Sequence, residues 1–255
     1  MSKHIGSCFR IPQLHTQHEV TGECFRAAII NLTETNTVPC DFNVYNKTGL
    51  LVPDHPYMIQ AGVAYGTPWI RDTSINIWNC ARIIEPEISR NTLFAVCFPD
   101  RFSRPVIQEP DDNGFEQSWD KIIWAIGAWT YFLSTGDMPF IKTAFDIINR
   151  SLDDLRYYKL NIKFGLFTGG SFFNDGIAGY PRDLYDSSIA SSFAPDHPRI
   201  RSIMCLSTNC IYCEAYRILH EMAIVFHDSS LSKSVLPGEA FSWLHHIVLL
   251  AQRRW

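Results

Sequence analysis

The chain has 255 residues, of which 46% are hydrophobic and 13% aromatic, and its formal net charge is −4 at pH 7. A chain of this length can bury a sizeable core and is close to the upper size of one domain. The mild acidity and the lack of any run of Lys and Arg argue against a nucleic-acid partner, because phosphate binding needs clustered basic residues.

Targeting signals and cysteine usage bear on the compartment. No apolar stretch reaches the length of a membrane span, and the N-terminus lacks the apolar core of a secretion signal. The eight cysteines are scattered through a long chain, so free thiols are favoured over disulfides. We therefore expect a soluble, cytoplasmic protein with no membrane partner.

Residues 1–56 are expected to form an N-terminal segment with a few strands. They mix short β-prone runs, Phe25–Leu32 and Phe42–Tyr45, with Asn, Thr and Pro, and they show no helical period. Residues 57–255 are expected to form a second, helical domain.

Helices are predicted in pairs from residue 72 onward. Asp72 can cap a helix that runs to about Ile84. The Glu85–Pro86 step breaks that helix, since proline disfavours α geometry in the residue before it and suits the first turn of the next helix. The second helix is expected to end near Cys97.

The next pair differs in how its members face water. Apolar residues surround the segment from Gln117 to Thr135 on nearly every side, which predicts a buried helix. Gly136 can end it and Pro139 can begin another helix, whose apolar stripe lies opposite a charged one. That second helix is expected to be half exposed.

A third pair covers Ser207–Phe226 and about Gly238–Arg253. Inner helices that are apolar all round, each followed by a one-sided outer helix, describe α-hairpins packed side by side. The fold class is therefore predicted to be all-α, an array of α-hairpins with a short β-containing N-terminal segment.

A first candidate site lies in residues 65–80, where three aromatic rings accompany Arg71 and Asp72. The guanidinium and the carboxylate can hold hydroxyl groups as donor and acceptor, and an indole such as Trp69 can cover the apolar face of a sugar ring. The pattern indicates a carbohydrate site. As an isolated residue, Asp72 is equally well explained as a helix cap.

The second candidate site is in the long segment from Lys159 to Met204, because connections of this length are usually functional or disordered. Aromatic residues flank Asp175 within the glycine-rich stretch Gly165–Pro181. A carboxyl group held among rings loses hydration, which favours its protonated form, so Asp175 is the candidate general acid. The alternative is that Asp175 and Gly176 form an ordinary turn.

These elements occur in a recognisable order. The elements are Trp69–Thr73, Trp119–Trp124 leading to Tyr131, Thr135–Asp137, Phe172–Gly176 and Thr208–Tyr216. In order and rough spacing the set resembles the six-hairpin glycosidases, and most closely the amylo-α-1,6-glucosidase domain of glycogen-debranching enzymes. The resemblance covers roughly residues 57–225.

The resemblance implies an (α/α)6 toroid whose active site lies where the loops of the inner helices converge. By position, Arg71 and Asp72 would bind the terminal sugar, with Trp69 as a wall of the pocket. Asp175 would be the general acid of an inverting reaction, in which two carboxylates are far enough apart to admit a water molecule.

Other positions would line the pocket. Trp119 and Asp120 match a pocket-lining element of the family. Phe173, Asn174 and Tyr180 stand close to Asp175 in the sequence and are assigned to substrate binding.

The chain departs from the family in length, since about three of six hairpins are present. The carboxylate that activates water normally comes from the missing half, and Glu239, at the start of a predicted outer helix, is better explained by the helix dipole. The chain is then either a fragment or closes against a partner chain. No metal or organic cofactor is expected.

The expected function is hydrolysis of a terminal, α-linked glucosyl unit of an oligo- or polysaccharide. The alternative is a non-catalytic carbohydrate-binding or helical scaffold protein. A third possibility, an iron–sulfur or metal site at Cys205, Cys210 and Cys213, has only weak support, because cysteines also pack well in helix cores.

Overall fold

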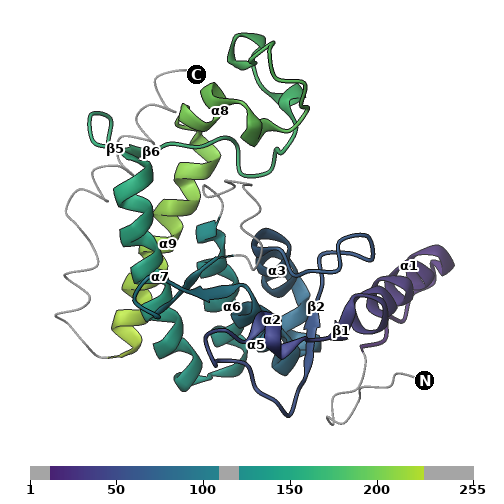
Figure 1. The fold of residues 1–255 in the computed structure, drawn as a ribbon. Helices are drawn as coiled ribbons and strands as arrows, with labels where there is room; N and C mark the ends of the chain where they lie inside the picture. The colour runs from purple at the N-terminus through teal and green to yellow at the C-terminus, as the bar shows by residue number, and fades with distance from the viewer. Residues whose placement is uncertain (1–11, 109–120, 227–255) are drawn as a thin grey trace. The chain divides into compact units, whose positions relative to one another are not determined.

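The computed structural model describes residues 12–108 and 121–226 (Figure 1). The chain divides into two compact units, each described here by itself: unit 1 comprises residues 1–110 and 127–140, and unit 2 comprises residues 111–126 and 141–255. Most described residues are helical, and the strands are short. The predicted helix near residues 238–253, together with Trp119, Asp120 and Glu239, lies outside the described residues.

The N-terminal part of unit 1 is more helical than the sequence suggested. It contains α1 (Glu19–Ile30), the π-helix η1 (Asn31–Thr35), β1 (Thr37–Pro39), α2 (Phe42–Tyr45) and β2 (Tyr57–Ile59), with β1 and β2 antiparallel. The strands predicted at Phe25–Leu32 and Phe42–Tyr45 are therefore wrong.

Local capping explains the second of these errors. The carboxylate of Asp41 accepts a hydrogen bond from the Asn43 N–H at 2.9 Å, which starts a helical turn despite the β-prone composition of Phe42–Tyr45. In the segment Phe25–Leu32, the helix α1 continues into the π-helix η1, and the Thr33 hydroxyl donates to the Ile29 carbonyl at that junction.

The first predicted helix pair is confirmed. Three consecutive pieces, α3 (Ile70–Asn76), the π-helix η2 (Ile77–Ala81) and α4 (Arg82–Ile84), precede α5 (Pro86–Ala95), and Pro86 occupies the first turn of α5. Asp72, however, is not the cap. The N-cap of α3 is Trp69, which places Asp72 inside the first turn.

The assignment of inner and outer helices is reversed in this pair. The second helix, α5, is the better buried one, whereas the first exposes Trp78 and Ile83. Polar residues of α5 are buried too, and some of them have their hydrogen bonds satisfied by a neighbouring segment of the fold. Thr92, for example, donates to the Ile88 carbonyl and accepts from the Ile59 N–H of β2.

A hairpin that the sequence analysis missed follows α5. Strands β3 (Cys97–Pro99) and β4 (Pro105–Ile107) pair antiparallel. Asp100 closes their turn by accepting from the Phe102 and Arg104 N–H groups and from the Arg104 guanidinium, and Ser103 adopts a left-handed φ of 60°.

The second helix pair is present as predicted, although the end of its first helix is not buried, since Leu133 is 62% exposed. The 3-10 turn η3 (Lys121–Ile123) leads into α6 (Trp124–Thr135), and α7 (Met138–Lys159) follows. Gly136 has a φ of 67°, as a helix-ending glycine requires, and Asp137 accepts from the Phe140 N–H at 3.0 Å to begin α7. The apolar stripe of α7 is buried and the opposite charged side is exposed, as expected.

Unit 2 continues with β5 (Leu160–Asn161), β6 (Leu166–Phe167), η4 (Ile177–Gly179), η5 (Arg182–Leu184), η6 (Ala194–Asp196), α8 (Pro198–Ser202) and α9 (Leu206–Val225). The last helix agrees with its prediction within one residue. It lies beside α7 (Figure 1), where the rings of Phe145 and Phe226 meet edge to face at 5.6 Å. Among the described helices, none combines the length and the apolar character needed to cross a bilayer.

Candidate functional site

The Trp69–Asp72 element is at the start of α3 in unit 1. A compact turn precedes it, in which Gly66 adopts a left-handed φ of 63° and Ala61 donates to the Thr67 carbonyl at 2.9 Å. The Trp69 carbonyl accepts the Thr73 N–H at 2.8 Å, so Arg71 and Asp72 occupy the second and third positions of the helix. Both side chains are half-buried.

Two polar side-chain groups beside this doublet are buried without a hydrogen-bond partner among the described residues. They are the indole N–H of Trp69 and the hydroxyl of Thr73. Buried donors are nearly always paired, because an unmade hydrogen bond costs about 1–3 kcal/mol. Because this N–H is shielded from solvent, a bound hydroxyl group can reach it only if the surrounding side chains move.

The start of α3 has a rigid support within unit 1. Ser74 is fully buried, and its hydroxyl donates to the Ile70 carbonyl at 2.6 Å. A Cβ at Gly127 of α6 would lie 3.1 Å from the Ser74 Cα, so the two helix backbones approach each other very closely there. Only glycine allows that approach.

The Phe172–Gly176 element is a turn in unit 2 whose two aromatic residues differ in burial. Phe172 is buried and its N–H donates to the Ser207 hydroxyl at 3.3 Å, whereas Phe173 is 70% exposed. The two rings are 4.1 Å apart and nearly perpendicular. The turn thus anchors one ring in the core and presents the other at the surface.

Tyr180 holds this turn together. Its hydroxyl accepts from the Ser171 N–H at 2.7 Å and donates to the Asn174 carbonyl at 3.0 Å. Burial raises the pKa of Tyr180, which keeps the phenol protonated as this donor role requires. The side chain of Asn174 lies so close to Gly179 that a Cβ there would collide with its amide. The structure shows Tyr180 and Asn174 as positioning residues for the turn.

Asp175 follows Asn174 in the sequence and is half-buried. Its backbone carbonyl accepts the Ala194 N–H at 2.6 Å, and Gly176 forms an antiparallel bridge with Phe193. A small core, in which Tyr180, Ala194 and Ile200 are buried, packs behind this contact. The backbone at Asp175 is therefore fixed by a second segment of the same loop.

Two residues at the start of α9 fasten the beginning of the loop. Asn209 is buried, accepts the Phe167 N–H at 2.8 Å and donates to the Phe167 and Cys205 carbonyls at 3.0 and 2.9 Å. The Thr208 hydroxyl donates to the Gly170 carbonyl. The sequence analysis included Thr208 and Asn209 in the family pattern without giving them a role.

His197 fastens the end of the loop and was missed entirely. It is 1% exposed, its Nδ1 accepts the Asp186 N–H at 3.1 Å, and its Nε2 donates to the Ser191 carbonyl at 3.0 Å. No motif surrounds it in the sequence. Its bonds are to backbone groups, which is the arrangement of a structural histidine.

The predicted residues thus form two local groups. Trp69, Arg71 and Asp72 are together in unit 1, and Phe173, Asn174, Asp175 and Tyr180 are together in unit 2. Trp119 and Asp120 lie outside the described residues, so their assignment stays a prediction.

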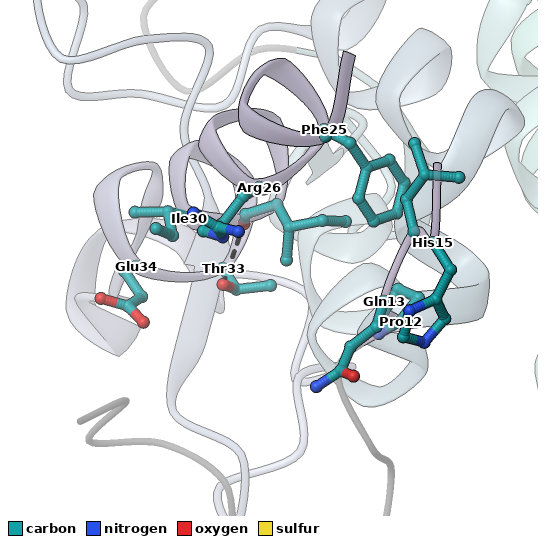
Figure 2. A pocket seen from close by; sticks show the side chains of 11 residues that line it. Pro12, Gln13, His15, Phe25, Arg26, Ile30, Thr33 and Glu34 are labelled. Carbon is teal, nitrogen blue, oxygen red and sulfur yellow. Dashed lines mark hydrogen bonds between the residues drawn. The ribbon is translucent and has the colours of Figure 1, made fainter. Parts of the chain in front are cut away.

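A pocket of about 520 Å³ lies elsewhere in unit 1, between residues 12–15 and the α1–η1 helix (Figure 2). Phe25, Ile29 and Ile30 are among its apolar lining, and Arg26 and Glu34 are among its charged groups. It includes none of the predicted sugar-binding residues. The sequence analysis did not anticipate it.

Two thiols of the cysteine cluster, Cys210 and Cys213 of α9, are weakly acidic. Burial raises the pKa of Cys213 to about 11 and also raises that of Cys210. Across the described part of the chain, no three His, Cys, Asp or Glu side chains are grouped so as to hold a metal ion.

Comparison of the chain with protein-family models, with curated proteins and with solved structures gives no match.

Proposed function

We propose that the chain is a glycoside hydrolase-like protein that acts on a terminal, α-linked glucosyl unit of an oligo- or polysaccharide. Arg71 and Asp72 hold the hydroxyl groups of the terminal sugar, and Trp69 covers its apolar face and donates its indole N–H. Asp175 protonates the leaving oxygen of the glycosidic bond.

The observation that carries the proposal is how the Asp175 turn is built. Tyr180, Ala194 and Ser207 bind its backbone, while Phe173, two positions before Asp175, remains exposed. A general acid must be held in a fixed geometry relative to the bond that it cleaves, and this turn has few ways to move. The unpaired Trp69 indole, next to a guanidinium and a carboxylate, supports the sugar-binding half of the proposal.

The reaction is proposed to invert the anomeric centre. In such enzymes the acid and the water-activating carboxylate are about 6.5–9.5 Å apart, with the water between them. The water-activating group is not assigned to any of the described residues.

A second candidate is a carbohydrate-binding protein without catalysis. The favouring observation is that the Trp69–Asp72 group needs no second carboxylate to bind a sugar. The two candidates separate cleanly, because only the first predicts that Asp175 matters for bond cleavage.

The test is to incubate the full chain with glucosyl oligosaccharides of α-1,4 and α-1,6 linkage and to follow released glucose by proton NMR. The inverting proposal predicts β-glucose as the first product. Asp175→Asn should lower release by about 10²–10⁴-fold, the usual contribution of a general acid, and leave binding measurable.

The matched control is Asp183→Asn, which removes an exposed carboxylate from the same loop and should leave release unchanged. Unchanged hydrolysis in Asp175→Asn would remove the acid assignment. Binding without any release in the wild-type chain would favour the second candidate.

A further inference from the structure

An unusual group of exposed apolar side chains lies at the end of α7 and on the β5–β6 turn of unit 2. Tyr157, Tyr158, Ile162 and Phe164 are 83%, 73%, 90% and 56% exposed. We name these four residues the hairpin-tip patch. Single exposed apolar residues are ordinary, but four within eight positions need an explanation.

The patch is held out rigidly. Asn161 accepts the Gly165 N–H at 2.8 Å and the Phe164 N–H at 3.2 Å with its carbonyl, and its side-chain oxygen accepts the Lys163 N–H at 3.1 Å. Gly165 takes the left-handed φ of 64° that this turn needs. The base of the hairpin is anchored in the core, where the Phe167 ring stacks on Tyr212 at 3.6 Å.

The charged residues within the segment that carries the patch, residues 157–164, are both basic. Lys163 is exposed between Ile162 and Phe164, with its Nζ 5.2 Å from the centre of the Phe164 ring, and Lys159 follows Tyr158. No acidic residue occurs between residues 155 and 164, although the whole chain carries a net charge of −4. Two carboxylates, Asp153 and Asp154, are exposed one turn before Tyr157 and Tyr158 on α7, so the basic character belongs to the β5–β6 turn rather than to the helix end.

From this combination we propose that the hairpin-tip patch docks on an anionic lipid surface, with Ile162 and Phe164 entering the headgroup region and Lys159 and Lys163 meeting the lipid phosphates. Apolar tips flanked by lysines bind such surfaces because hydrophobic insertion and electrostatic attraction add together. Tyrosine rings are favoured at the same depth, since one end is apolar and the other polar.

Two other occupants fit the patch less well. Bases of a nucleic acid and sugar rings stack on flat aromatic platforms, but the rings of Tyr157 and Tyr158 stand at 87° to each other. Nucleic-acid binding also needs more clustered cations than two lysines supply. The expectation of no membrane partner rested on the absence of a spanning segment, which docking on a lipid surface does not require.

The test measures how the full chain partitions onto vesicles of phosphatidylcholine with and without phosphatidylserine. Binding should require phosphatidylserine and weaken with added salt. The double variant Ile162→Ser/Phe164→Ser should bind about tenfold less, and Lys163→Gln about fivefold less, the effect expected of one lysine near a charged surface. All three positions are exposed.

Phe102→Ser is the matched control. Phe102 is 61% exposed on the β3–β4 turn with arginines beside it, but Asp100 neutralises Arg104 there through a contact of 2.7 Å. That variant should bind vesicles like the wild type. If the double variant Ile162→Ser/Phe164→Ser does not fold, the Lys163→Gln variant still tests the proposal.

Several outcomes would overturn the proposal. They are wild-type binding that is absent or equal on neutral vesicles, tip variants that bind normally, or loss of binding in Phe102→Ser. Capture of a single-stranded oligonucleotide in place of vesicles, or dimerisation that the double variant abolishes, would assign the patch to a different occupant.

Discussion

At the scale of single residues, buried asparagines attach loops to helices in both units. Asn91 of α5 accepts the Val52 N–H and donates to the Val52 and His55 carbonyls, and Asn209 of α9 does the same for Phe167 and Cys205. An amide side chain can donate two hydrogen bonds and accept others at the same time, so one residue can hold several backbone groups of a segment. Each asparagine therefore fixes a segment that has few regular backbone partners.

Asn209→Asp should reveal this role. The carboxylate can still accept from the Phe167 N–H, but it loses both donated bonds and buries a charge, so the free energy of unfolding should fall by about 2–4 kcal/mol. Urea unfolding measures the change. Asn149→Asp, the same substitution on the exposed side of α7, should change stability by less than about 0.5 kcal/mol. Equal losses of stability in the two variants would contradict the proposed role of Asn209 in fixing the loop.

Residue types in the candidate site were predictable, but their tasks were only partly so. The sequence indicated the Trp69–Asp72 group and the Asp175 turn, because aromatic rings next to charged groups leave a local signature. It could not show that Trp69 would be the helix cap, nor that Tyr180 would bind the backbone at Ser171 and Asn174. Those roles depend on the backbone path of the turn, which brings together residues six and nine positions apart and which composition does not reveal.

At the scale of elements, close helix packing at Gly127 supports the start of α3. A valine there would place its Cβ 3.1 Å from the Ser74 Cα and 3.3 Å from the Leu93 Cδ2. Backbone cannot yield as a flexible side chain can, so Gly127→Val should lower the free energy of unfolding by about 1–3 kcal/mol.

The control for this prediction is Gly62→Val, where the nearest atom to the new Cβ would be the Tyr65 Cδ2 at an ordinary 3.8 Å. Thermal unfolding should show a lower midpoint for the Gly127 variant only. A Gly127 variant as stable as the Gly62 variant would mean that α6 can move away from α3 without cost.

Element boundaries were predicted best where one residue type determines the backbone. Gly136 and Pro86 end or begin helices for steric reasons that hold in any context, and both predictions were confirmed. The inner and outer assignment of α5 failed, because Asn91 and Thr92 read as a surface face until their partners in residues 52–59 are known. The strands predicted at Phe25–Leu32 and Phe42–Tyr45 failed because propensity is a weak signal in short segments.

At the scale of the whole molecule, the proposed function draws on residues of both units. The family resemblance assigns sugar binding to Arg71 and Asp72 in unit 1 and acid catalysis to Asp175 in unit 2. The structure gives each group a defined local geometry. The hairpin array and the toroid remain predictions, because closing a ring depends on contacts between helices far apart in the sequence.

The most direct test of this claim is an NMR titration of the isotope-labelled full chain with an α-linked glucosyl oligosaccharide. The account predicts that the Trp69 indole N–H and the Asp175 backbone N–H shift together, with one saturation curve, and that Asp72→Asn weakens both responses about tenfold or more. Shifts at only one of the two groups, or separate curves for the two, would contradict a common sugar site.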